Sequence, residues 1–168
     1  MQIREATEDD WPAIHPLFRA VVDAGETYAY PAGLSMEEAR PLWMEAPPGR
    51  TFVAVDGGRV LGSAKTGPNR PGRGAHVATA SFMVDPAAQG RGVGRALGEH
   101  VVAAARADGY RAMQFNAVVE TNTAAVALWR SLGFRIVGTV PEAFEHPEHG
   151  FVGLHVMHLD LRAADGVR

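Results

Sequence analysis

The sequence predicts an α/β fold in which helices pack on both faces of a mixed sheet. Two observations support this fold class. Three strand-like segments follow one another in the middle of the chain, whereas a doubly wound fold would alternate strands and helices more strictly. Helix-like and strand-like segments then alternate in the second half. The 168 residues suffice for a single hydrophobic core, and no internal repeat or low-complexity linker interrupts them.

The first part of the chain is expected to form one strand and two helices. Residues 2–6 alternate polar and apolar side chains, which is typical of a strand. Thr7 and Asp10 form a carboxylate variant of the capping box, which predicts a helix over residues 7–24. The same device recurs at the start of a second helix over residues 35–46.

Turn residues delimit the three central strands. The run Asp56-Gly57-Gly58 is a strong hairpin signal between the first two strands. A loop rich in glycine and proline, residues 67–74, precedes the third. These strands are expected at residues 51–55, 59–66 and 76–84.

The second half of the chain alternates helices and strands and then closes with two strands. Gly109 and Gly133 each follow a helical pattern in the position of a C-cap glycine. The helices are expected at residues 90–109 and 122–132, and the strands at residues 111–118, 134–140 and 150–161. The polar segment over residues 142–150 is expected to be a long loop between the last two strands.

Composition narrows the function classes. A net charge of −3 gives no basic field for nucleic acid, and the lack of cysteine excludes disulfides, thiolate zinc sites and a cysteine nucleophile. No apolar run reaches the roughly 18–20 residues of a membrane span and no signal-peptide pattern is present, so we expect a cytoplasmic protein with no membrane partner. One domain is expected over residues 1–162, followed by a tail over residues 163–168.

The seven histidines do not predict a metal site. His146 and His149 flank Pro147, which prevents the helical spacing that would turn both rings to one ion. His155 and His158 are separated by an odd number of residues on a predicted strand, which places them on opposite faces.

The stretch DPAAQGRGVGRAL joins the third central strand to a helix, where bare N–H groups and the helix dipole favour an anion. It lacks the Gly-Lys-Ser/Thr of a Walker A loop, and Arg95 stands where a dinucleotide fingerprint needs glycine or alanine. The pattern that fits is Q-x-x-G-x-G, through Gln89, Gly92 and Gly94. The alternative is a glycine-rich helix start without a ligand. Three glycines inside a first helical turn would cost about 1 kcal/mol each relative to alanine, which a bound anion would offset.

A second motif lies on the next helix, in NTAAVALWRSLGF. It fits the pattern N-x-x-A-x-x-[L/F]-Y-x-K-x-G-F, except that Trp129 stands at the tyrosine and Ser131 at the lysine. The residues that fit are Asn122, Ala125, Leu128, Gly133 and Phe134. Together the two motifs resemble the GCN5-related N-acetyltransferase (GNAT) family, and the resemblance extends over residues 3–161.

The resemblance implies a mostly antiparallel sheet of about seven strands, with a V-shaped splay between the fourth and fifth strands. It implies that the pantetheine of acetyl-CoA lies in this gap along the fourth strand, that the pyrophosphate lies on the glycine-rich turn, and that no metal takes part. The cofactor-binding residues that it implies are Phe82, Met83, Val84, Gln89, Gly90, Arg91, Gly92, Val93, Gly94, Arg95, Asn122 and Trp129.

The reaction that the resemblance implies is direct attack of a neutral amine on the thioester in a ternary complex. Many members protonate the leaving thiolate with a tyrosine at the position of Trp129, but an indole N–H has no comparable acidity. We therefore expect Trp129 to pack or to cover the cofactor. The candidate catalytic residues are Asn116, Glu120 and Asn122, of which the first two share one strand face if alternation holds. Asn122 is equally suited to being only a helix N-cap, and Glu120 to being only an exposed strand end.

A closer resemblance is to fungal acetyltransferases that act on azetidine-2-carboxylate and other proline analogues. It is carried by PN.PGR..HV, by FN.V.ETN and by Phe82. It implies that Phe82, Thr79 and Asn116 contact the substrate, and that Arg70 or Arg73 attracts a carboxylate. Thr79 replaces an asparagine of the fungal pattern, which leaves the amine undetermined.

Two other function classes stay open. Trp129 and the lack of a carboxylate on the fourth strand favour a non-catalytic acyl-CoA-binding domain. A protein or peptide N-acetyltransferase would need an open groove, whereas Tyr28, Tyr30 and Trp43 indicate a closed pocket for a small-molecule amine. In this family the segment 142–150 often borders the acceptor site or a dimer interface, and we also expect a homodimer.

Overall fold

The computed structural model describes residues 1–162, so the predicted tail over residues 163–168 lies outside the described residues. The strands are β1 (Gln2–Glu5), β2 (Arg50–Asp56), β3 (Arg59–Pro68), β4 (Val77–Val84), β5 (Ala112–Val119), β6 (Arg135–His146) and β7 (Gly150–Asp160). The helices are α1 (Trp11–Ala24), α2 (Met36–Trp43), α3 (Val93–Ala107) and α4 (Thr123–Ser131). Short 3-10 turns occupy Glu8–Asp10, Gly72–Gly74 and Pro86–Ala88.

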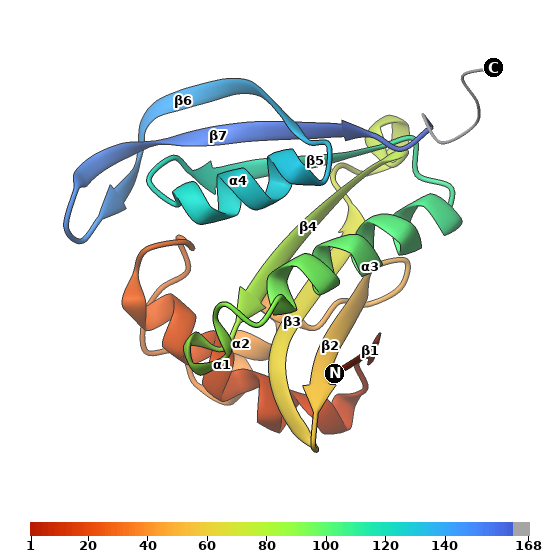
Figure 1. The fold of residues 1–168 in the computed structure, drawn as a ribbon, viewed down its shortest axis with the longest axis vertical. Helices are drawn as coiled ribbons and strands as arrows, with labels where there is room; N and C mark the ends of the chain where they lie inside the picture. The colour runs from red at the N-terminus through yellow and green to blue at the C-terminus, as the bar shows by residue number, and fades with distance from the viewer. Residues whose placement is uncertain (163–168) are drawn as a thin grey trace.

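All seven strands form one sheet in the order β1-β2-β3-β4-β5-β7-β6 (Figure 1). Only β4 and β5 run parallel to each other, and every other neighbouring pair is antiparallel. The predicted fold class, a mostly antiparallel mixed sheet of about seven strands, is therefore confirmed.

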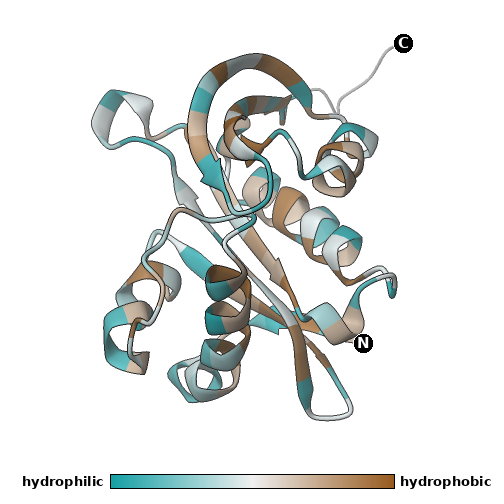
Figure 2. Ribbon diagram, turned by 90° about the vertical axis from the view of Figure 1, so that its left-hand side faces the viewer, coloured by the Kyte–Doolittle hydropathy of each residue, from teal (hydrophilic) through white to brown (hydrophobic). Residues whose placement is uncertain are grey.

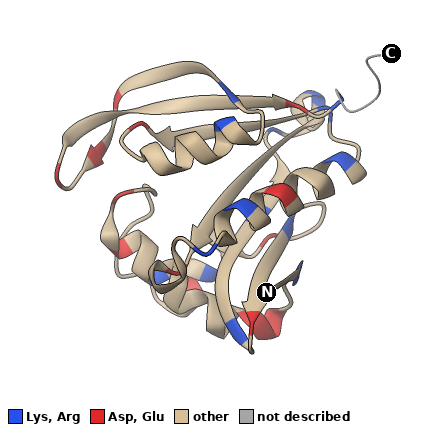
Figure 3. Cartoon of the chain, in the orientation of Figure 1, with Lys and Arg blue, Asp and Glu red and all other residues tan. Residues whose placement is uncertain are grey.

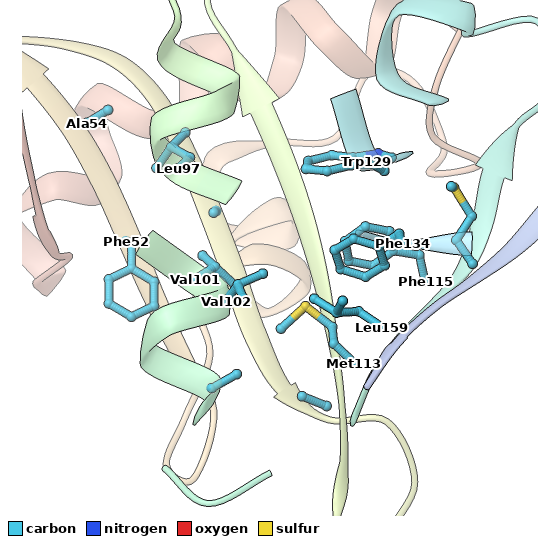
Figure 4. Close-up of a cluster of buried hydrophobic side chains, with 14 of the residues drawn as sticks. Phe52, Ala54, Leu97, Val101, Val102, Met113, Phe115, Trp129, Phe134 and Leu159 are labelled. Carbon is cyan, nitrogen blue, oxygen red and sulfur yellow. The ribbon is translucent and has the colours of Figure 1, made fainter. Parts of the chain in front are cut away.

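Alternation along β2 assigns the helices to the two faces. Phe52 and Ala54 pack with residues of α3 and α4 in one core cluster, while Val53 packs with α1 and α2 in another. Figure 4 shows the first cluster, in which Leu97, Val101 and other side chains of α3 face the sheet. Hydrophobic residues recur along the strands, and hydrophilic residues concentrate in the connecting turns (Figure 2). Helices therefore cover both faces, as predicted.

Local capping signals place the first two helices. The side chain of Asp10 accepts the Thr7 N–H at 2.7 Å ahead of α1, and Ser35 and Glu38 exchange hydrogen bonds of 3.1 and 2.9 Å at the start of α2. α1 ends at Gly25, which has a φ of 70°. None of the helices within residues 1–162 is both long and apolar enough to cross a bilayer.

Two predictions about the strands are wrong. The segment 142–150 is not a long loop, because β6 continues to His146 against β7 and only a tight turn joins them. Phe144 explains the difference. Its buried ring packs with Val152 of β7, and this contact is made when residue 144 lies in a strand paired with β7. On β5 the register shifts between Phe115 and Val118, so one extra residue interrupts the strict alternation expected for the stretch 116–120.

Lys65, the only lysine in the sequence, ties the middle of β3 to the end of α2. Its ammonium donates to the Leu42 carbonyl at 2.7 Å and lies 3.2 Å from the carboxylate of Glu45. It also lies 5.7 Å from the centre of the Trp43 ring. Three neighbours of different chemistry thus hold this amine, and 19% of the side chain is exposed.

Candidate active site

The sheet opens between β4 and β5. The two strands pair only at Val77 with Ala112 and at Ala78 with Met113, and then diverge while β5 pairs with β7 (Figure 1). This confirms the predicted V-shaped splay. A cavity of about 660 Å³ lies in the divergence, a size typical of small-molecule and cofactor sites. We call it the splay cavity. Its wall comes from β4, β5, α4, the end of α1 with the loop that follows, and single residues of β6 and β7.

A tyrosine from the loop between α1 and α2 occupies the free edge of β4. The Phe82 N–H donates to the Tyr28 hydroxyl at 2.8 Å, and this hydroxyl donates to the Phe82 carbonyl at 2.6 Å. The other edge of β4 pairs with β3. Burial raises the pKa of the Tyr28 phenol well above its usual value, so it stays protonated at neutral pH. The splay thus exposes backbone groups of β4 that accept a hydrogen-bonding partner from the cavity side.

The glycine-rich turn leads from β4 to α3. Gly90 and Gly92 have φ angles of 76° and 77°, in the left-handed region that favours glycine. The helix begins at Val93, and its first hydrogen bond joins the Ala96 N–H to the Gly92 carbonyl at 3.0 Å. The N–H groups before Ala96 have no acceptor within the helix. The expectation of three glycines inside the first turn is wrong, because Gly90 and Gly92 precede it and serve the backbone conformation instead.

Two arginines flank this turn, and Figure 3 shows positive charge on the turn and on the first part of α3. Arg91 pairs with Asp56 at 3.0 Å. Arg95 donates to the Ser131 hydroxyl at 2.8 Å and lies 3.7 Å from the carboxylate of Glu99. Exposed pairs of this kind contribute about 0–1 kcal/mol each, so either guanidinium can exchange its partner for a stronger anion.

Aromatic rings form the floor of the splay cavity. The Trp129 ring lies 4.6 Å from that of Phe82 and 5.0 Å from that of Phe115, and Trp129 is only 7% exposed (Figure 4). A Cβ atom at Gly98 of α3 would lie 3.0 Å from the Trp129 ring and 2.8 Å from Leu132. The indole therefore packs where α3 and α4 approach closely, and its role in covering the cofactor stays a prediction.

Some of the remaining candidate residues line the splay cavity and others do not. Asn122, Asn116 and Thr79 line the splay cavity, whereas Glu120 does not. The Asn122 side chain accepts the Ala125 N–H at 3.2 Å as the N-cap of α4. Glu120 accepts the N–H of Gly153 on β7.

The amide of Asn116 already has two partners. Its Nδ2 donates to Asn69 at 2.6 Å, and its Oδ1 accepts from Gln114 at 2.9 Å. Asn69 belongs to the loop before β4, so this network ties the loop to β5. Of the predicted cofactor residues, those that line the cavity are Phe82, Met83, Val84, Gln89, Asn122 and Trp129. Residues 90–95 form the turn next to it.

Among the wall residues that sequence reasoning missed are Glu26, Phe144 and, for the role of its hydroxyl, Tyr28. Tyr28 was visible only as one of several aromatic residues, since no motif marks a tyrosine that bonds a distant strand. Phe144 lay in the segment expected to be a loop. Its position within EAFEH, a large aromatic side chain in a polar segment, was the available signal.

His146 and His149 lie together, but the described residues add no third metal ligand beside them. The rings of His146 and His149 stack with centres 4.5 Å apart at the β6–β7 turn. The Nδ1 of His146 accepts the N–H groups of Glu148 and His149. Over residues 1–162 no three histidine or acidic side chains come together as metal ligands would.

Known proteins share this arrangement. The model of the Acetyltransferase (GNAT) family matches residues 4–134, which is well over half of the chain. The chain belongs to the GNAT family. The family predicted from the two motifs is thus confirmed.

Similar GNAT proteins support the fold along its whole length. A GCN5-related N-acetyltransferase from Kribbella flavida is 65% identical, with a TM-score of 0.91 over 95% of this chain and 96% of its own. The protein yncA from Salmonella typhimurium, whose structure includes its cofactor acetyl-CoA, is 28% identical, with a TM-score of 0.82 over 100% of this chain and 99% of its own.

A curated relative, the N-acetyltransferase aca1 of Schizosaccharomyces pombe, is 32% identical over 98 residues, which is 58% of this chain and 47% of aca1. The chain thus spans about half the length of that relative. The closer resemblance to fungal proline-analogue acetyltransferases stays a prediction.

Proposed function

We propose that this chain transfers an acetyl group from acetyl-CoA to the amine of a small molecule, in a ternary complex. The observation that carries the proposal is the splay cavity, which joins a bare helix N-terminus to an enclosed aromatic end along one free strand edge. Such a cavity suits a long, partly polar cofactor with its reactive end inside the sheet.

The residues present fit acetyl-CoA. The unpaired N–H groups at the start of α3 and the positive end of its dipole suit a diphosphate, and Arg91 and Arg95 lie two residues to either side of Val93, where the helix begins. The cavity-facing backbone of β4 suits an extended amide chain such as pantetheine. When bound, acetyl-CoA supplies the activated acetyl thioester.

The chain's own residues then supply orientation and electrostatics. An N–H on the free edge of β4, near Val84, stabilises the negative charge that develops on the carbonyl oxygen. Asn122 orients the cofactor from the start of α4, and Trp129 with Phe82 excludes water from the floor. Asn116 ties β5 to the loop before β4 through its contact with Asn69. Trp129 stands where many members of the family have the tyrosine acid, and the Tyr28 hydroxyl donates to the Phe82 carbonyl, so we assign the proton transfers to water.

The role of Glu120 as a base stays a prediction. Its carboxylate is engaged by the Gly153 N–H and it lies outside the cavity wall, so it would act through water. A small acceptor is favoured over an extended peptide, because Tyr28 and Tyr30 enclose the acceptor end. Proline analogues and other amino acids are one acceptor class that the fungal resemblance suggests, since Phe82, Thr79 and Asn116 all line the wall.

A screen of amines with acetyl-CoA, read by a thiol reagent that reports released CoA, tests the proposal. The chain has no cysteine, so the reagent has no protein background. Amine-dependent release of CoA with formation of the N-acetyl product is expected. Binding of acetyl-CoA without turnover of any amine would indicate a non-catalytic acyl-CoA-binding domain. Turnover of peptides alone would indicate a protein acetyltransferase.

A further inference from the structure

We propose that the acceptor is an amine that carries no carboxylate and has an apolar body. This inference rests on the proposed function and selects between acceptor classes within it. It separates amino acids, including proline analogues, from simple amines and amine derivatives without a free acid.

We call one part of the splay cavity the acceptor end and define it by the elements that form its wall. Its wall combines the end of α1, the loop after it, and the hairpin β6–β7. The side chains there are Val21, Ala24, Tyr28, Tyr30, Phe144 and Leu154. Apolar burial contributes about 25 cal/mol per Å², so this wall favours an acceptor that brings apolar surface rather than charge.

The charge of the wall argues in the same direction. Among the described residues that line the cavity, Glu26 is the one that carries a charge at neutral pH, and it is negative. The expected carboxylate partners, Arg70 and Arg73, are exposed and outside the wall, and Arg70 donates to the Asn69 carbonyl at 3.0 Å. A bound carboxylate would thus lose its hydration, find no cation and face a like charge.

The neutral donors do not compensate. Tyr28 directs its hydroxyl proton to the Phe82 carbonyl, and the Asn116 amide donates to Asn69. Thr79 and Ser81 also line the cavity, and a hydroxyl can orient an amine by accepting its N–H. Neutral hydroxyls do not replace the paired cation that a buried carboxylate requires.

Glu26 has a positive role for an amine without a carboxylate. Most simple amines are cationic at neutral pH, and an exposed carboxylate at the cavity wall concentrates them there. An amino acid near neutral pH has no net charge and gains little from the same field. Glu26 is therefore a specificity-determining residue rather than a catalytic one.

Matched amine pairs that differ only in the carboxylate test the inference: phenethylamine against phenylalanine, and azetidine against azetidine-2-carboxylate. Released CoA thiol gives kcat/KM, corrected for the fraction of neutral amine at each pH. We expect the carboxylate-free partner to be favoured about 100-fold in each pair. Equal or better turnover of the amino acids would overturn the inference while leaving the acetyltransferase function in place. No turnover of either class, or of any other amine, would overturn both.

The variant Glu26→Gln separates the charge from the shape of the wall. We expect the KM of phenethylamine to rise about 3-fold at low ionic strength, with the difference shrinking in 0.5 M salt. The matched control is Glu37→Gln, an exposed residue of α2 outside the cavity, which should leave KM unchanged. An unchanged KM in Glu26→Gln would remove that residue from substrate selection.

Discussion

The two ends of the splay cavity are built in different ways. The end proposed to bind the cofactor comes from two continuous stretches, residues 82–95 and 122–129, and backbone conformation shapes most of it. The acceptor end is assembled from side chains of α1, the loop after it, β5, β6 and β7. Backbone requirements leave glycine spacings in the sequence, whereas a wall of distant side chains leaves no local pattern. Cofactor binding, which the family shares, can therefore be predicted from sequence motifs, whereas selection of the amine cannot.

The substitution Gly92→Asp should have the largest effect, confined to the cofactor end. A carboxylate at the start of α3 would lie among the N–H groups proposed to bind the diphosphate, and its like charge should raise the KM for acetyl-CoA about 100-fold. Gly109→Asp is the control, since its φ of 85° gives the same backbone strain beyond the other end of α3. An unchanged KM in Gly92→Asp, or an equal rise in both variants, would separate the turn from the cofactor.

Asn122→Ala distinguishes a helix cap from a cofactor contact. Loss of the bond to the Ala125 N–H should lower the free energy of unfolding by about 1 kcal/mol, and loss of the cavity contact should lower kcat about tenfold. Ser35→Ala removes a comparable cap from α2 and should leave kcat unchanged. If kcat is normal in both variants, Asn122 is a cap only. Urea unfolding and steady-state kinetics provide the two measurements.

Tyr28→Phe probes the boundary between the two ends. The change leaves the N–H and carbonyl of Phe82 without their partner, so the free energy of unfolding should fall by about 1–2 kcal/mol. Saturating CoA should reduce this difference, because a ligand paired along β4 replaces the hydroxyl. Tyr30→Phe, in the stacked neighbouring ring, is the control. A difference that is the same with and without CoA would contradict pairing of the ligand at Phe82.

The smallest effect concerns Asp10, which supports the start of α1 and touches neither end. Its hydrogen bond to Arg4, with help from the Thr7 N–H, lowers the pKa of Asp10 to about 2. The ionised form therefore stabilises the fold above the unfolded pKa near 4, and this contribution is lost as the pH falls from about 4 towards 2.

Accordingly, Asp10→Asn should cost about 1 kcal/mol at pH 7, and the difference from the parent should shrink below pH 4 in urea titrations. Asp9→Asn, exposed in the same turn, serves as the control. A cost that does not change with pH would show that the charge of Asp10 contributes nothing.

What could be predicted from the sequence follows the same division. The capping pairs Thr7–Asp10 and Ser35–Glu38 and the Q-x-x-G-x-G turn are local, and the structure places each near the expected position. The α3 boundary was wrong by three residues of glycine-rich backbone, because left-handed glycines and a first helical turn have the same composition. The splay came from the family resemblance rather than from any residue pattern.

The two wrong predictions about the strands depend on partners in the neighbouring strand. Polar composition marked the segment 142–150 as a loop, but pairing with β7 and burial of Phe144 make most of it a strand. The irregular pairing beyond Phe115 depends on the spacing of the opposite strand. Asn116 lines the cavity, and its contact with substrate stays a prediction; Asn69 and Gln114 bond its amide, which ties the loop before β4 to β5.

The single lysine has a consequence for an acetyltransferase. Acetyl-CoA acetylates exposed protein amines without any enzyme, and lysine side chains are the usual targets. Here the one ε-amine is held by Leu42, Glu45 and the Trp43 ring. An amine held by these contacts is not free to turn towards the thioester. In the folded protein Lys65 is thus protected from the acetyl-CoA that the chain is proposed to bind. Acetylation mapped at Lys65 would therefore report unfolding rather than modification of the native state.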